Sequence, residues 1–137
     1  MVFGMSETIV TLTMNPAVDI STHAEKVEPT RKVRCHSVRR DPGGGGINVA
    51  RVICRLGGAA TAIYTSGGHS GRVLTALLED DSIVADLLPV SDATRVTFSV
   101  LEQSTDSRFR FVLPGPVLSE ETWRSCLDRL ARTAPRS

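Results

Sequence analysis

The chain has 137 residues, of which 41% are hydrophobic and 23% are charged, and its formal net charge at pH 7 is +1. This composition belongs to a globular chain and excludes wholesale disorder. A net charge near zero provides no basic field that would attract nucleic acid. No apolar stretch reaches the roughly 20 residues that a membrane span needs. We therefore expect a cytoplasmic protein with neither nucleic acid nor a membrane among its partners.

The cysteines and histidines are too scattered to form a metal site. Cys35, Cys54 and Cys126 include no closely spaced pair, which a zinc site would need. The three histidines offer no paired spacing either. We expect reduced thiols in a cytosolic protein and no bound metal.

Three segments have the apolar spacing of helices. The first runs from Ile47 to Leu56, and Gly57-Gly58 is expected to end it in a left-handed cap. The second follows Gly67-Gly68 and ends near Asp80 and Asp81, whose charges oppose the dipole of a longer helix. The last covers 119–132, with Ser119 as its cap and Glu120 and Glu121 in its first turn.

Uncharged and charged segments predict two kinds of strand. The uncharged segments 8–13 and 59–65 predict interior strands of a parallel crossover unit, and 83–90 predicts a further short strand. The charged segments predict an antiparallel sheet with one wet face. Its strands are 20–26 and 31–40, joined by a turn at 28–30, and the hairpin of 94–101 and 108–113.

Four consecutive glycines, Gly43 to Gly46, precede the first helix. Glycine allows a close backbone approach to a ligand, and the helix start offers unpaired amides. The phosphate-loop pattern fails because Ile47 and Asn48 follow the glycines, and the dinucleotide fingerprint fails because Asn48 occupies its third glycine position. A generic flexible loop is the alternative. Asn48 favours a ligand-binding loop, since Asn is a poor helix former and its amide here could face a ligand.

These segments carry a family resemblance. The stretch from Gly43 to Gly67, GGGGINVARVICRLGGAATAIYTSG, resembles the N-terminal signature of ribokinase-like, PfkB-type carbohydrate kinases. Asn15-Pro16-Ala17-Val18-Asp19 resembles the NPAxD segment of the phosphosugar branch, and the segments 32–34 and 109–115 extend the likeness over about 8–130. The implied fold is α/β: part of a ribokinase-like, Rossmann-type parallel sheet with helices, plus a small antiparallel β-lid.

The resemblance implies sugar-binding roles. Asp19 would accept hydrogen bonds from sugar hydroxyls, and a turn or cap residue is the alternative interpretation. Lys32 and Arg95 match positions near phosphate groups, with solvated strand charges as the alternative. The implied substrate-binding residues are Asp19, Gly43, Gly44, Gly45, Asn48, Lys32 and Arg95. Five other arginines are interpreted as ordinary surface charges: Arg34, Arg39, Arg40, Arg108 and Arg110.

The resemblance implies ATP-dependent phosphorylation of a phosphosugar, with ATP and Mg²⁺ as the family's cofactors. The 1-phosphofructokinases usually carry Lys at the position of Gly45, whereas the four-glycine form is closer to the minor 6-phosphofructokinase branch. Fructose 6-phosphate is therefore the expected substrate. The family's catalytic base lies in a GAGD motif that the 137 residues do not contain, so no catalytic residue is assigned.

We interpret residues 1–137 as the N-terminal part of such a kinase domain, with lid strands at about 20–40 and 94–113 and without the ATP-binding part. The lid commonly forms a dimer contact in the family, which implies a homodimer. One hypothesis is a kinase chain that carries only the sugar-binding half and is inactive alone. The alternative is a non-catalytic module that binds a phosphosugar or dimerises through its lid. Unpaired parallel strands further predict dimerisation, aggregation or marginal folding of the isolated chain.

Overall fold

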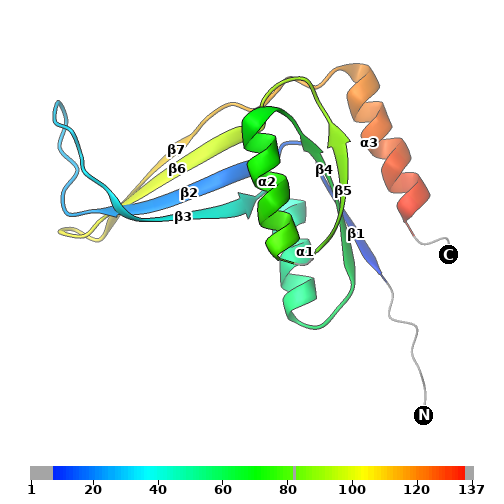
Figure 1. Cartoon of the computed structure of the whole chain (residues 1–137), viewed down its shortest axis with the longest axis horizontal. Coiled ribbons are helices and arrows are strands. Elements are labelled where there is room, and N and C mark those ends of the chain that lie inside the picture. Colours follow the sequence, from blue (N-terminus) through cyan, green and yellow to red (C-terminus); the bar gives the residue numbers. More distant parts are fainter. Residues whose placement is uncertain (1–7, 82, 135–137) are drawn as a thin grey trace, which may run out of the picture.

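The computed structural model describes residues 8–81 and 83–134. Its first layer is a parallel sheet of three strands in the order β1-β4-β5. Helices α1 and α2 cover one face of this sheet and α3 lies on the other face (Figure 1). These elements are β1 Ile9–Thr13, α1 Gly45–Arg55, β4 Ala60–Ser66, α2 Gly68–Asp80, β5 Val84–Pro89 and α3 Glu120–Thr133.

The core lies between the parallel sheet and the helices α1 and α2. Ile63 and Tyr64 of β4 are buried, as are Leu74 and Leu78 of α2. Burying a leucine side chain of this kind stabilises the fold by about 1.5–3 kcal/mol. The Tyr64 hydroxyl lies 2.9 Å from Thr75 Oγ1, so its polar end is satisfied. The predicted alternation of uncharged strands and apolar helices is therefore confirmed.

The predicted helix ends are confirmed as well. Gly57 has a φ of 84°, and the Gly58 amide donates to the carbonyl of Ile53, as a left-handed cap requires. The amide of Thr122 donates to Ser119 Oγ at 3.1 Å, which caps α3.

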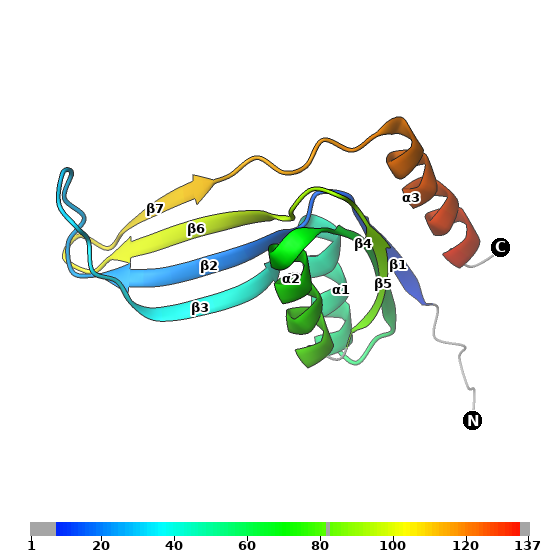
Figure 2. The ribbon, with the colours of Figure 1, turned by 45° about the horizontal axis from the view of Figure 1, so that its top comes forward.

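The lid is a four-stranded sheet that projects from the parallel layer (Figure 2). Its strand order is β3-β2-β6-β7, and the two outer pairs are antiparallel as predicted. The central pair, β2 with β6, is parallel, so the expectation of a fully antiparallel lid is wrong. Its strands are β2 Ala17–Ala24, β3 His36–Gly43, β6 Arg95–Glu102 and β7 Ser107–Val112.

The parallel pair has a topological cause. Strand β2 follows β1 and strand β6 follows β5, and both β1 and β5 run in the direction of β4. The chain therefore leaves the same edge of the parallel sheet twice and enters the lid twice in the same direction. The strands β3 and β7 return it, which makes the outer pairs antiparallel.

The segment 25–35 forms a loop at the outer end of the lid, where the sequence predicts a short turn followed by a strand from residue 31. Glu102 stabilises this loop, because its carboxylate accepts hydrogen bonds from the Val27 amide at 2.6 Å and from the Thr105 hydroxyl. Positive φ angles at Thr30 and Ser37 also interrupt the extended backbone. Within the described residues, no helix is long and apolar enough to cross a membrane.

Candidate functional site

The sequence motifs meet where the lid joins the carboxyl edge of the parallel sheet. Asn15 packs on Gly115, where an added Cβ would lie 2.9 Å from Asn15 Cγ. Arg95 Nε donates to the Asn15 carbonyl at 3.3 Å. Segments that are 80 and 100 positions away along the chain therefore converge on the turn that leads into Asp19. In α/β sheets this edge is the usual place for a ligand.

Asp19 lies within β2, rather than in a turn or cap position, and faces a cleft on one side of the lid. The hydroxyl of Thr97 donates to its Oδ1. Gly43 lies directly against the same carboxylate, because a Cβ at this position would be 2.6 Å from Asp19 Cγ. Gly43 thus leaves the space that the acceptor carboxylate occupies.

The cleft lies on one face of the lid, has a volume of about 330 Å³ and is lined in part by polar and charged side chains. Alternate residues of a strand share a face, so the strand register brings two rows of side chains side by side. One row contains Asp41, Asp19, Thr97 and Val112, and the next contains Arg39, Ser21, Ser99 and Arg110. All of these except Arg39 line the cleft, as do Arg108, Ile20, Phe98 and Phe111.

Two cations on β7 complete this surface. Arg108 and Arg110, which the sequence interprets as ordinary surface charges, are exposed and also line the cleft that contains Asp19. The alternation in the segment 108–112 places both arginines on one face of the strand, which is the signal that could have identified them. The cleft therefore offers a carboxylate for hydroxyl groups and guanidinium groups for an anion.

Asp41 lies opposite Asp19 in the strand register, and two facing carboxylates normally destabilise a sheet. Here Arg39 neutralises Asp41 through two contacts, at 2.7 Å to Oδ2 and 2.9 Å to Oδ1. The hydrogen bond from Arg39 to Asp41 raises the pKa of this guanidinium. The carboxylate of Asp19, in contrast, has its contact with the neutral hydroxyl of Thr97.

The glycine loop packs on the end of β1. Gly44 has a φ of 125°, which favours glycine, and a Cβ there would lie 2.6 Å from Thr13 Cγ2. A Cβ at Gly46 would lie 2.6 Å from Thr13 Oγ1. The same hydroxyl accepts a hydrogen bond from the Ile47 amide at 3.1 Å. Sequence reasoning missed this role of Thr13, since a threonine in a strand carries no distinctive signal.

The other predicted residues lie at different distances from the cleft. Gly45 opens α1, and a Cβ there would meet no atom within 4 Å. Asn48 is exposed on the first turn of the helix and does not line the cleft. Arg95 lies beside Asn15, outside the cleft lining. Lys32 is exposed on the outer loop of the lid, also outside the cleft lining.

The cysteines are free thiols in the structure, with Cys35 exposed and Cys126 buried. Burial raises the pKa of the Cys126 thiol. Among residues 8–81 and 83–134, no three His, Cys, Asp or Glu side chains lie close enough together to hold a metal ion.

A parallel sheet with helices on both faces and a lid that rises from its carboxyl edge are the features of a ribokinase-like α/β fold. The family model described as pfkB family carbohydrate kinase matches residues 9–131. The chain belongs to the pfkB family of carbohydrate kinases.

Individual relatives agree with this assignment. The ATP-dependent 6-phosphofructokinase isozyme 2 of Mycobacterium tuberculosis is 49% identical over 126 residues, which are 92% of this chain and 37% of that protein. The crystal structure of phosphofructokinase-2 from Escherichia coli in complex with fructose-6-phosphate matches with a TM-score of 0.87 and 38% identity, covering 92% of this chain and 42% of that chain. The tetrameric inhibited form of the same enzyme matches with a TM-score of 0.85 and 38% identity, covering 92% of this chain and 41% of that chain. The chain thus spans less than half the length of these relatives.

Proposed function

We propose that this chain is the sugar-binding part of an ATP-dependent kinase whose substrate is a phosphosugar, with fructose 6-phosphate as the specific ligand. The observation that carries the proposal is a single cleft that presents the Asp19 carboxylate and the guanidinium groups of Arg108 and Arg110. A phosphosugar has hydroxyl groups for the carboxylate and a phosphate for the arginines. The relative crystallised with fructose-6-phosphate supports this choice of ligand.

The proposed contacts divide by chemistry. Asp19 accepts hydrogen bonds from sugar hydroxyls, and the glycine loop allows the ligand to approach its backbone closely. The amides in the first turn of a helix have no intrahelical partners. In α1, Thr13 Oγ1 accepts a hydrogen bond from the Ile47 amide and from no other amide of that turn. The proposed substrate-binding residues are Asp19, Gly43, Gly44, Gly45, Asn48, Lys32 and Arg95, to which the cleft adds Arg108 and Arg110.

ATP and Mg²⁺ are the cofactors that the proposed activity requires. No carboxylate cluster that would hold Mg²⁺ occurs within the described ranges, and the 137 residues contain no GAGD motif. The residues of this chain therefore do not fit the cofactor side of a kinase site, and we assign no catalytic base to them. We propose that residues 1–137 correspond to the N-terminal part of the kinase domain and work in the cytoplasm, where free thiols persist.

A second proposal concerns the lid as a homodimer interface. Strand β7 is an edge strand whose residues are all exposed, and an unpaired edge with apolar side chains favours association. The exposed apolar residues of the lid and its exit are Val38, Phe98, Phe109, Phe111, Val112 and Leu113. Lid-mediated dimerisation without catalysis is the alternative function that these residues favour.

Calorimetric titration of the 137-residue chain tests the proposed ligand. We expect fructose 6-phosphate to bind, and fructose or inorganic phosphate alone to bind more weakly, because each engages only one side of the cleft. Asp19→Asn should weaken binding about 10- to 100-fold, the loss expected for one hydrogen bond to a charged group. Asp106→Asn is the matched control, since it makes the same change at an exposed turn of the lid. Absence of binding by the unaltered chain would refute the proposal.

A further inference from the structure

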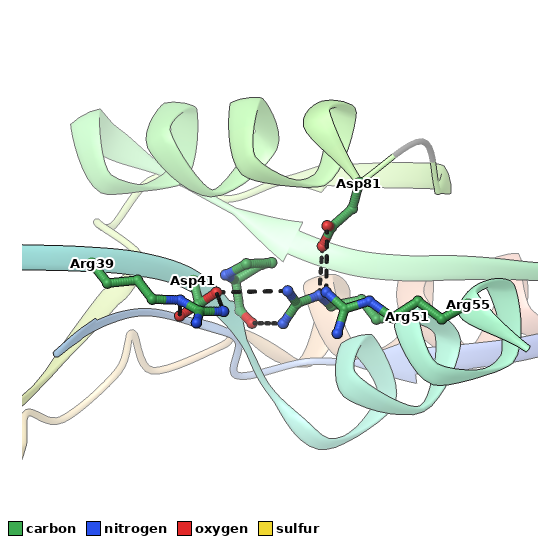
Figure 3. Close-up of polar contacts among 6 residues, drawn as sticks. Arg39, Asp41, Arg51, Arg55 and Asp81 are labelled. Carbon is green, nitrogen blue, oxygen red and sulfur yellow. Dashed lines mark hydrogen bonds and ion pairs between the residues drawn. The ribbon is translucent and has the colours of Figure 1, made fainter.

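Arg51 on α1 makes contacts that the sugar site does not explain. Its side chain is only 12% exposed, whereas that of Arg55, one turn further along the same helix, is 63% exposed. Arg51 Nε donates to Asp81 Oδ2 at 2.5 Å. Its two other nitrogens lie 3.7 Å from Asp41 Oδ1 and 3.4 Å from the carbonyl oxygen of Pro42. Figure 3 shows this guanidinium between the end of β3 and the end of α2.

These contacts connect the two ends of the glycine loop. Pro42 immediately precedes Gly43, and Arg51 lies one turn after Asn48 on the helix that the loop begins. The bond from Arg51 to the Pro42 carbonyl therefore joins both ends of the segment that contains Gly43 to Gly46. Four consecutive glycines have an unusually large conformational freedom to lose, so a tether across them favours one loop conformation.

The second anchor fixes this closed loop to the parallel layer. Asp81 is the residue after the last turn of α2, and it receives Arg51 at 2.5 Å and Arg55 at 3.7 Å. A planar guanidinium can serve a carboxylate, a carbonyl and a second carboxylate at once, which an ammonium cannot do with the same geometry. Arg51 thus connects the base of the lid and the glycine loop to the end of α2.

We propose that Arg51 is a positioning residue that preorganises the glycine loop for its ligand. It acts through the Pro42 carbonyl and Asp41, and it does not line the cleft. The identity of the ligand rests on the proposed function. The set of Arg51 contacts to Pro42, Asp41 and Asp81, which we call the clamp, does not depend on it. A preorganised loop binds more tightly because less conformational freedom is lost on binding.

Hydrogen exchange of the intact chain tests the clamp directly. In Arg51→Met, the hydrogen-bonded amides of Ile47 and Asn48 should exchange about 10-fold faster or more than in the unaltered chain, while those of β4 stay within about 2-fold. Arg55→Met is the matched control, and it should leave both segments unchanged. Arg51→Lys should show an intermediate effect at the loop, because lysine keeps the positive charge but lacks the planar guanidinium with its several donors.

Arg51→Met could act simply by leaving Asp81 without its strongest partner. The double variant Arg51→Met with Asp81→Asn removes that charge, and the loop should still exchange faster. The dissociation constant for fructose 6-phosphate should rise about 10-fold in Arg51→Met and in the double variant. In Arg55→Met it should stay within about 2-fold of that of the unaltered chain.

The outcomes separate the clamp from the proposed function. If the unaltered chain does not bind fructose 6-phosphate, the proposed function fails, and the exchange rates still decide whether the clamp exists. Unchanged exchange in the loop, or an equal acceleration in β4, would overturn the clamp. Faster exchange confined to the loop with an unchanged dissociation constant would overturn its role in ligand binding.

Discussion

Alanine at Gly43 should displace the Asp19 carboxylate, whereas alanine at Gly45 should displace no neighbouring atom. In Gly43→Ala, the new Cβ would lie 2.6 Å from Asp19 Cγ and 2.7 Å from Oδ1, far inside the 3.5–4.0 Å at which carbon atoms pack. The Asp19 side chain must therefore turn away and lose its hydrogen bond from Thr97. In Gly45→Ala, the new Cβ meets nothing within 4 Å.

The magnitude follows from the contact that is displaced. A hydrogen bond to a charged group contributes about 1.5–3 kcal/mol, so displacing Asp19 should raise the dissociation constant for fructose 6-phosphate about 10- to 100-fold. Gly45→Ala should leave the Asp19 side chain in place and raise the stability by up to about 1 kcal/mol, because alanine favours a helix over glycine. Calorimetric titration and thermal melting measure the two effects. Equal binding by Gly43→Ala and the unaltered chain, or a lower melting temperature in Gly45→Ala, would refute this reasoning.

Three further predictions concern charge, pH and thiol reactivity. Arg110→Gln should weaken the binding of fructose 6-phosphate about 10-fold or more and leave that of fructose unchanged in the same titration, because only the phosphate needs the cation. Hydrogen bonds from Thr105 and from the Val27 amide hold the pKa of Glu102 below its ordinary value, so its stabilising effect is complete above about pH 4.5 and is lost as the pH falls further. Glu102→Gln should thus lower the melting temperature at pH 7, and the difference should shrink towards pH 3. Cys35 should react quickly with a thiol reagent at pH 8, whereas Cys126 should react only after unfolding, because it is buried and its pKa is raised.

Each of these has an outcome that would contradict it. Loss of fructose binding in Arg110→Gln would mean that the arginine holds the cleft together and does not select the phosphate. A stability difference for Glu102→Gln that grows with acidity would reverse the sign argued here. Equal reaction rates for the exposed and buried cysteines in the folded chain would exclude the described packing of α3.

Local sequence patterns were sufficient to predict most of the elements. The uncharged segment before Asn15 and the apolar spacing after the glycine run each admit one interpretation, since the hydrophobic period and the flanking glycines agree. The glycine run itself pointed to the site through its resemblance to the family. Strand β3 begins later than the sequence predicts, because a loop occupies the start of the predicted strand. Buried Glu102 stabilises this loop by accepting a hydrogen bond from the Val27 amide, which is 75 positions away in the chain.

What the sequence could not supply are relations between distant segments. The parallel pairing of β2 with β6 depends on the order of strands in the other sheet, which no local pattern encodes. Arg51 reads as an ordinary charged position on an apolar helix until Asp81, 30 positions away, is placed beside it. The alternation in 108–112 puts Arg110 on one face of its strand, but only the strand register shows that this is the face of the lid with Asp19.

The central claim is that one cleft on the lid binds both ends of a phosphosugar. The most direct test is an NMR titration of the isotope-labelled 137-residue chain with fructose 6-phosphate, following the backbone amides. We predict that the amides of Asp19, the glycine loop, Thr97 and Arg110 shift together along a single saturable curve, while those of α3 do not move. Shifts confined to the arginines, or equal shifts with inorganic phosphate, would show that the cleft binds an anion and not a phosphosugar.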